Sequence, residues 1–166
     1  MPTVTFDAKR TKEEYQLRCD IFDGILPVEK RGMPFEKKIY PWKSAESDTS
    51  FWFTPWDDIV RWTGINEILI DMFRRPDYVH SIIDRMVTAW LHRLDQYERL
   101  GLLKAPPMKF WGIGAAQIFA AASPAMHEEF ALKPEARWYE RFGNNFYGCC
   151  EPLHHKVDII KKNIPR

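Results

Sequence analysis

Hydrophobic residues recur at three- and four-residue steps over residues 76–100, and this is the strongest periodic signal in the chain. The apolar positions of this stretch are Val79, Ile82, Ile83, Met86, Trp90, Leu91, Leu94 and Tyr97. Pro76 suits the first turn of a helix, and Gly101 suits the position after its end. The pattern therefore predicts one long amphipathic helix with a single apolar stripe.

Shorter helices are predicted before this long one. A first helix is expected from Thr11 to about Asp23, because Thr11 and Glu14 have the spacing of a capping box. Another helix begins at Pro55, and Gly64 separates it from a third over Ile65–Arg75. Residues 27–50 contain several prolines and scattered charges, which predict irregular structure.

Short apolar stretches alternate with helical stretches in the second half. The predicted strands are Ser50–Thr54, Ala115–Phe119 and Asn145–Cys149, and the alanines of the second stretch also allow a helix. The last two are separated by a helix that begins at Ser123-Pro124 and ends before Gly143, and residues 152–162 form a further helix. This alternation predicts β-α units and a parallel sheet, in which ligands bind at the carboxyl ends of the strands.

Composition narrows the class of protein. The 166 residues are 45% hydrophobic and 28% charged, which is typical of a globular chain. The formal net charge of +1 gives no electrostatic reason to expect nucleic acid as a partner. No apolar run approaches a membrane span, and the first residues do not resemble a signal peptide. The seven tryptophans predict a large core or a large cavity wall.

The three cysteines, Cys19, Cys149 and Cys150, do not form a disulfide framework, because adjacent cysteines rarely bridge each other. Free or metal-bound thiols in a reducing compartment are expected, and hence a cytoplasmic location.

Five side chains that can bind zinc cluster at a predicted strand-to-helix turn. They are Cys149, Cys150, Glu151, His154 and His155. A helix beginning just after the turn would lower the pKa of the thiols, and zinc would hold a thiolate at neutral pH. Only one of the two cysteines is expected to face the site if the strand continues. The alternative is that these residues are ordinary buried cysteines and surface histidines.

A second set of candidates would bind substrate. Gln117 could point into the centre of a barrel, His127 lies in a first helical turn, and Trp111 could line an apolar cavity. Ordinary packing or helix capping remains the alternative for each. No glycine-rich nucleotide loop and no serine-hydrolase motif is present, so nucleotide and serine-hydrolase functions have no support.

Two segments, SPAMHEEF (residues 123–130) and YGCCEPLH (residues 147–154), resemble the uroporphyrinogen decarboxylase superfamily. The closer resemblance is to its branch related to corrinoid-dependent methyltransferases, and it extends over nearly the whole chain. It implies an α/β fold that is part of a TIM-type (β/α)8 barrel, with a helix-rich N-terminal half. It also implies an enzyme with its site at the carboxyl ends of the strands.

In the methyltransferase members, a zinc ion held by His-x-Cys and a later Cys activates a thiol, which takes a methyl group from a corrinoid protein. The cysteine of this motif matches Cys149 or Cys150, whereas Tyr147 or Gly148 stands in place of the histidine. Glu151 or His154 would then complete the zinc site. The resemblance therefore implies zinc as cofactor, a corrinoid on a partner protein and a small-molecule substrate.

A complete barrel needs about 250 residues, so the chain is expected to be the middle of one. We expect a single partial barrel domain, with a linker and first helix over residues 1–49 and β-α units over residues 50–166. Exposed strand edges would favour self-association.

Two alternatives to methyl transfer stay open. One is decarboxylation of a tetrapyrrole, with Arg31, Arg61 and Arg74 as candidate carboxylate partners. The other is an inactive remodelled barrel with a binding or self-association role.

Overall fold

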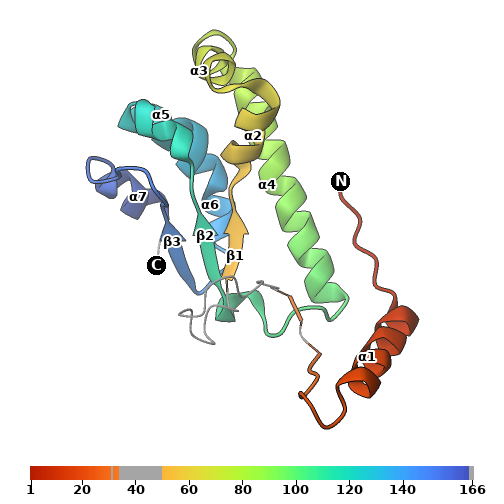
Figure 1. Cartoon of the computed structure of the whole chain (residues 1–166). Coiled ribbons are helices and arrows are strands. Elements are labelled where there is room, and N and C mark those ends of the chain that lie inside the picture. The colour runs from red at the N-terminus through yellow and green to blue at the C-terminus, as the bar shows by residue number, and fades with distance from the viewer. Residues whose placement is uncertain (31, 34–49, 165–166) are drawn as a thin grey trace.

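The protein is a mixed α/β structure in which helices pack against one face of a small sheet (Figure 1). The computed structural model describes residues 1–30, 32–33 and 50–164. Most of the predicted irregular segment 27–50, together with Arg31, therefore lies outside the described residues. One helix near the N-terminus, α1 (Ala8–Phe22), lies well away from the sheet in Figure 1.

The sheet is open and parallel, and its strands follow each other in chain order. It contains β1 (Ser50–Phe53), β2 (Trp111–Gly114) and β3 (Asn144–Tyr147), paired as β1-β2-β3. The register aligns Trp52 with Ile113, and Ile113 with Phe146. Parallel neighbours need crossover connections, and helices supply them here. The predicted parallel sheet is confirmed.

Helices make up most of both crossovers. The first crossover contains α2 (Pro55–Thr63), α3 (Ile65–Arg74), α4 (Pro76–Arg99) and the short η2 (Pro107–Lys109). The second contains η3 (Gln117–Ala121), α5 (Pro124–His127), η4 (Glu128–Leu132) and α6 (Lys133–Tyr139). The last helix, α7 (Val157–Asn163), follows β3. The predictions of α2, α3 and the long α4 are confirmed.

The second crossover helix is continuous from α5 to α6 but contains a π-helical turn at η4. Pro134 lies just after this turn. A proline lacks the N–H of the normal helical bond, and its ring clashes with the carbonyl four residues earlier. A local widening of the helix before Pro134 accommodates both effects. Ser123 caps the start as predicted, since its Oγ accepts a hydrogen bond from the backbone N of Met126 at 3.2 Å.

The prediction of a strand over Ala115–Phe119 is wrong, because β2 lies earlier, at Trp111–Gly114. Its two glycines, Gly112 and Gly114, lie just before the stretch expected to form the strand. A Cβ on Gly112 would come within 2.5 Å of the Phe142 ring, and one on Gly114 within 1.8 Å of Tyr139 Oη. Glycine is therefore required where helix side chains cross this strand closely.

Two predicted helix boundaries are also wrong. The first helix begins at Ala8 rather than Thr11, because Asp7 is the N-cap and its Oδ1 accepts a bond from Arg10 N at 2.8 Å. The helix predicted over residues 152–162 begins only at Val157. The intervening residues form a turn held by side-chain bonds that the apolar pattern does not reveal.

The core lies between the sheet and the helices α4 and α6. Phe53 is fully buried, and its ring centroid lies 5.6 Å from Trp90 on α4 and 5.0 Å from Trp138 on α6. Phe51 packs against Phe142 in the same layer, with ring centroids 5.8 Å apart.

On the opposite face of the sheet, three large side chains are partly exposed. Trp52, Trp111 and Phe146 on this face are 40%, 43% and 51% exposed, respectively. We call this surface, formed by Trp52, Trp111, Ile113 and Phe146, the bare face. The row of Trp52, Ile113 and Phe146 is apolar across all three strands, whereas the neighbouring row pairs Trp111 with the polar Ser50 and Asn144. The exposed side of a solvated sheet is normally polar throughout.

The N-terminal helix is attached to the rest by a short extended segment. Gln96 on α4 is buried and accepts a hydrogen bond from Val4 N at 2.9 Å and donates one to Pro2 O at 3.0 Å. Helix α1 itself has no buried residue. Among the described helices, none has both the length and the apolar character that crossing a membrane requires.

Candidate functional site

Because the three strands are parallel, their carboxyl ends lie at one edge of the sheet. Phe53, Gly114 and Tyr147 are the last residues of β1, β2 and β3. The segments that leave this edge carry Asp57 in the first turn of α2 and Cys149 just beyond β3. This edge therefore carries side chains that can take part in acid–base or thiol chemistry.

The two adjacent cysteines lie together in the turn that follows β3. Their Sγ atoms are 3.5 Å apart, and both residues are exposed and unbridged. The strand ends at Tyr147, so the condition under which only one of the cysteines would face the site is not met. Glu151 closes the turn, because its Oε2 accepts a hydrogen bond from Cys149 N at 2.9 Å.

No helix N-terminus stabilises these thiolates, contrary to expectation, because α7 begins only at Val157. The pKa of the Cys150 thiol is instead raised, first by its hydrogen bond with Cys149 and further by the charge of Glu151. Without a metal, Cys150 is therefore held as a thiol at neutral pH.

The chemistry of this turn fits zinc in part. Two thiols at 3.5 Å can bind one ion, and the other carboxylate oxygen of Glu151, Oε1, is buried without a hydrogen-bond partner. His154 lies exposed beyond them, with its ring tilted against that of His155 and the ring centroids 3.8 Å apart. No group of three or more metal-binding side chains is assembled within residues 1–30, 32–33 and 50–164. The turn thus supplies two sulfur donors of the usual four.

His127 is completely buried, on the side of the sheet that the helices cover. Its Nε2 lies 2.7 Å from the hydroxyl of Tyr147, and its Nδ1 has no partner. Burial, followed by the charge of Lys156, lowers the His127 pKa to about 4. His127 is therefore a neutral, buried partner of Tyr147, and it does not lie in an exposed helical turn.

Lys156 is buried at the far end of the cysteine-bearing turn. Its Nζ donates hydrogen bonds to the carbonyl oxygens of Phe119 and Ala122, the latter at 3.0 Å. Burial lowers the pKa of this amine, while the carboxylate of Glu151 opposes that effect. The amine therefore connects the end of the turn to the segment that follows β2.

The predicted substrate-binding residues are not brought together. Gln117 is exposed at the start of η3 and does not lie on a strand. Trp111 is at the opposite end of β2 from Gln117 and belongs to the bare face. His127 lies on the covered side, so the three residues do not share one cavity wall.

The arginines considered for carboxylate binding also do not converge on the strand ends. Arg61 on α2 pairs with Asp58 of the same helix at 2.9 Å, and Arg74 is exposed in the last turn of α3. Arg31 lies outside the described residues.

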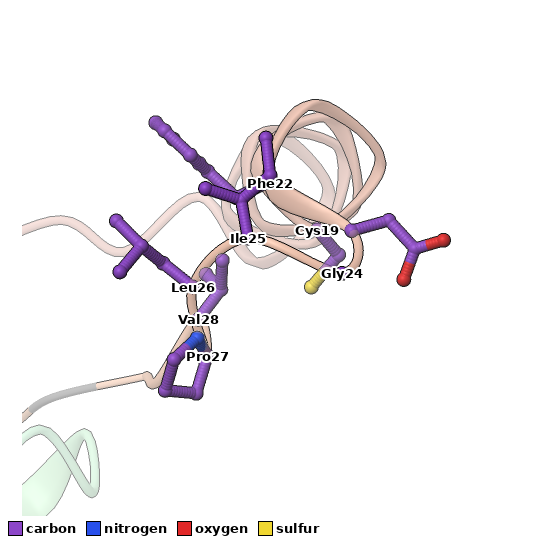
Figure 2. Close-up of a pocket in the computed structure, with 8 residues that line it drawn as sticks. Cys19, Phe22, Gly24, Ile25, Leu26, Pro27 and Val28 are labelled. Carbon is purple, nitrogen blue, oxygen red and sulfur yellow. The ribbon is translucent and has the colours of Figure 1, made fainter.

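A hollow of about 470 Å³ lies elsewhere, at the end of α1 (Figure 2). It is lined by Cys19, Phe22, Asp23, Gly24, Ile25, Leu26, Pro27 and Val28. These side chains are mostly apolar and come from one continuous segment. The hollow is therefore a feature of the α1 turn and not part of the strand-end site.

Sequence reasoning missed several polar groups beneath the strand ends. Glu135 is fully buried, and Tyr139 Oη donates to its Oε2 at 3.3 Å. Loss of hydration raises the Glu135 pKa to about 8. The pKa of Asp57 is also raised, first by loss of hydration at its carboxyl group and then by the charge of Asp58, with a smaller contribution from Glu151. The helical periodicity that places Glu135 among apolar neighbours was the one available signal.

Comparison with known proteins adds no relative to this description. No known family, no curated protein and no solved structure matches the chain.

Proposed function

We propose that the chain is part of a (β/α)8 barrel of the uroporphyrinogen decarboxylase type, and that it contributes a zinc-thiolate site for methyl transfer from a corrinoid. The supporting observation is the cysteine pair at the carboxyl edge of a parallel sheet whose strands follow chain order. In a barrel, enzyme sites are built from the loops at that edge.

The two faces of the sheet support the barrel part of the proposal. Consecutive parallel strands with helices on one face are the repeating unit of a barrel, in which the other face is turned inward. The bare face carries Trp52, Ile113 and Phe146 in one register row. Large apolar side chains in such a row suit the packed interior of a barrel.

Each proposed role belongs to a named group. Cys149 and Cys150 would hold zinc. Glu151 or His154 would add a further donor, although neither is placed beside the two sulfur atoms as a third ligand. Zinc held there would supply Lewis-acid chemistry that lowers the pKa of a thiol substrate. The sulfur of that substrate would accept the methyl group of the corrinoid, with the electron pair of the carbon–cobalt bond left on cobalt and the thiol proton released to solvent.

Methyl transfer from free methylcobalamin to a small thiol, with zinc added, tests this function. The visible spectrum of the corrinoid reports loss of the methyl group. We expect turnover by the wild type and by Cys19→Ser, whose substitution lies on α1, and loss of turnover in Cys149→Ser/Cys150→Ser. Equal rates in all three proteins, or none in the wild type with zinc bound, would contradict methyl transfer.

A second role, self-association, is supported by the bare face itself. Large apolar side chains exposed on one face are typical of surfaces that contact another molecule. Analytical ultracentrifugation of the wild-type chain tests this role, and a monomer at every concentration would exclude it.

A further inference from the structure

The turn that carries the cysteines, residues 148–156, is fastened at both ends to the segment that follows β2. Its beginning is held by Tyr147 and its end by Lys156. Both side chains reach residues between Gly114 and His127. We call residues 148–156 the cysteine turn.

Three contacts or conformational features hold the beginning of the cysteine turn. Tyr147 Oη and His127 Nε2 are 2.7 Å apart, and the His127 ring stacks on Phe119 with centroids 4.8 Å apart. Gly148 N donates to Gly114 O at 2.9 Å, which continues the strand pairing by one residue. Gly148 has φ +130°, a conformation that favours glycine, and a Cβ there would lie 2.8 Å from Leu153. The chain therefore leaves β3 in one defined direction.

The fastening at the end is a buried amine. Lys156 Nζ bonds two carbonyl oxygens, of Phe119 and Ala122, on the same segment that supports His127. Removing this amine would take one hydrogen bond from each carbonyl, and only Phe119 O would keep the bond that it accepts from Ala122 N at 3.1 Å. The amine thus prevents the cysteine turn from swinging away from the sheet.

We propose that Tyr147 and Lys156 are positioning residues that hold Cys149 and Cys150 as one preformed two-thiol unit for a soft, thiophilic ion. This deepens the proposed function, since it concerns the same two thiols. A ligand that must contact both sulfurs binds more tightly when the sulfurs are already held close together, because less conformational entropy is lost on binding. The Sγ–Sγ distance of 3.5 Å allows simultaneous contact with one ion.

Phenylarsine oxide is a suitable probe, because its trivalent arsenic bonds two thiols at once. Two arsenic–sulfur bonds form, the arsenic–oxygen bonds break, and the two thiol protons leave with the oxygen as water, so nothing is oxidised or reduced. Binding would be measured by native mass spectrometry and by competition with a small dithiol. Cys19 serves as the internal control, since it is a single thiol on α1.

The variants Tyr147→Phe and Lys156→Met remove one fastening each, and Tyr78→Phe, at an exposed tyrosine of α4, is the matched control. We expect stoichiometric binding by the wild type and the control. We expect affinity about tenfold weaker in Tyr147→Phe, which corresponds to the loss of one buried hydrogen bond. The alkylation rate of Cys149 and Cys150 should also change, while that of Cys19 stays constant. Tyr147→Phe preserves the ring, so it remains informative if Lys156→Met fails to fold.

Unchanged affinity in a folded Tyr147→Phe would overturn the positioning role, and so would a wild type that binds no arsenical. These outcomes are separable from failure of the proposed function. A preformed thiol pair that binds arsenic but supports no methyl transfer leaves the positioning role intact and removes only the reaction.

Discussion

The two faces of the sheet carry similar residues but have opposite environments. Phe51 and Phe53 point to the helices and are 7% and 0% exposed, whereas Trp52 between them is 40% exposed. The helix-covered face also holds the buried polar groups that organise the carboxyl edge, including His127 and Glu135. The comparison shows that the same apolar pattern stabilises this fold on one face and leaves a surface to be covered on the other.

The largest expected effect is the difference in unfolding free energy between alanine variants of two adjacent residues, one on each face of β1. Phe53→Ala should lower the free energy of unfolding by about 3–5 kcal/mol, because it leaves a cavity among packed aromatic rings. Trp52→Ala should change it by less than about 1 kcal/mol, as for an exposed residue. Urea unfolding measures both. Equal losses would mean that both faces are packed in the isolated chain.

A glycine on the covered face gives the next largest effect. Gly114→Ala should cost about 2–3 kcal/mol, since the new methyl group would overlap Tyr139 Oη and force the helix away from the strand. Gly24→Ala is a useful control, because its site has φ +69° but no atom within 4 Å. It should cost about 1 kcal/mol, from backbone strain alone. A neutral Gly114→Ala would show that the strand and helix separate easily.

The buried acid and the buried histidine make the covered face sensitive to pH. The folded-state pKa of Glu135 is raised to about 8, so its contribution is complete below pH 4.5 and is lost as the pH rises toward 8. The folded-state pKa of His127 is lowered to about 4, so its contribution is complete above pH 6.5 and is lost as the pH falls. Between pH 4.5 and 6.5, Glu135 lowers the stability as the pH rises, whereas His127 raises it, so the two effects oppose each other.

Stability should therefore fall by about 2 kcal/mol between pH 6.5 and 8, at ~1.4 kcal/mol per pH unit. Glu135→Gln, which stays neutral, should remove most of this fall. Urea midpoints across the pH range test the prediction, with Glu129→Gln, at an exposed site, as the control. If Glu135→Gln lost as much stability over this pH range as the wild type, the pH dependence would come from another titratable group.

The smallest effect on stability is expected on the bare face, where association should respond instead. Trp52→Lys and Phe146→Lys should shift the unfolding free energy by about 0.5 kcal/mol or less. They should abolish any self-association seen by sedimentation velocity, because like charges would meet at an apolar contact. Association that persists in both variants would place the contact elsewhere.

Much of the helical architecture could be predicted from sequence, because periodicity and caps are local signals. The apolar stripe of α4 and the breaks at Gly64 and Gly101 are examples. The strand β2 could not be located by the same reasoning. Glycine is needed at positions 112 and 114 because the side chains of Phe142 and Tyr139 lie directly against them. That contact connects positions about thirty residues apart, which no local pattern records.

The candidate site was foreseen only as a cluster of residue types. The proximity of Cys149, Cys150 and Glu151 follows from their adjacency in the chain. The contribution of Tyr147 depends on a hydrogen bond to His127, 20 residues away, and that of Lys156 on carbonyls 34 and 37 residues away. Those partners are defined by the fold and not by spacing.

Zinc bound per chain is the most direct test of the central claim, that the cysteine pair at the carboxyl edge is the functional centre. Elemental analysis after dialysis against a weak chelator would compare the wild type, Cys19→Ser and Cys149→Ser/Cys150→Ser. The account predicts stoichiometric zinc in the first two proteins and none in the third. Zinc retained equally by all three, or absent from the wild type, would contradict it.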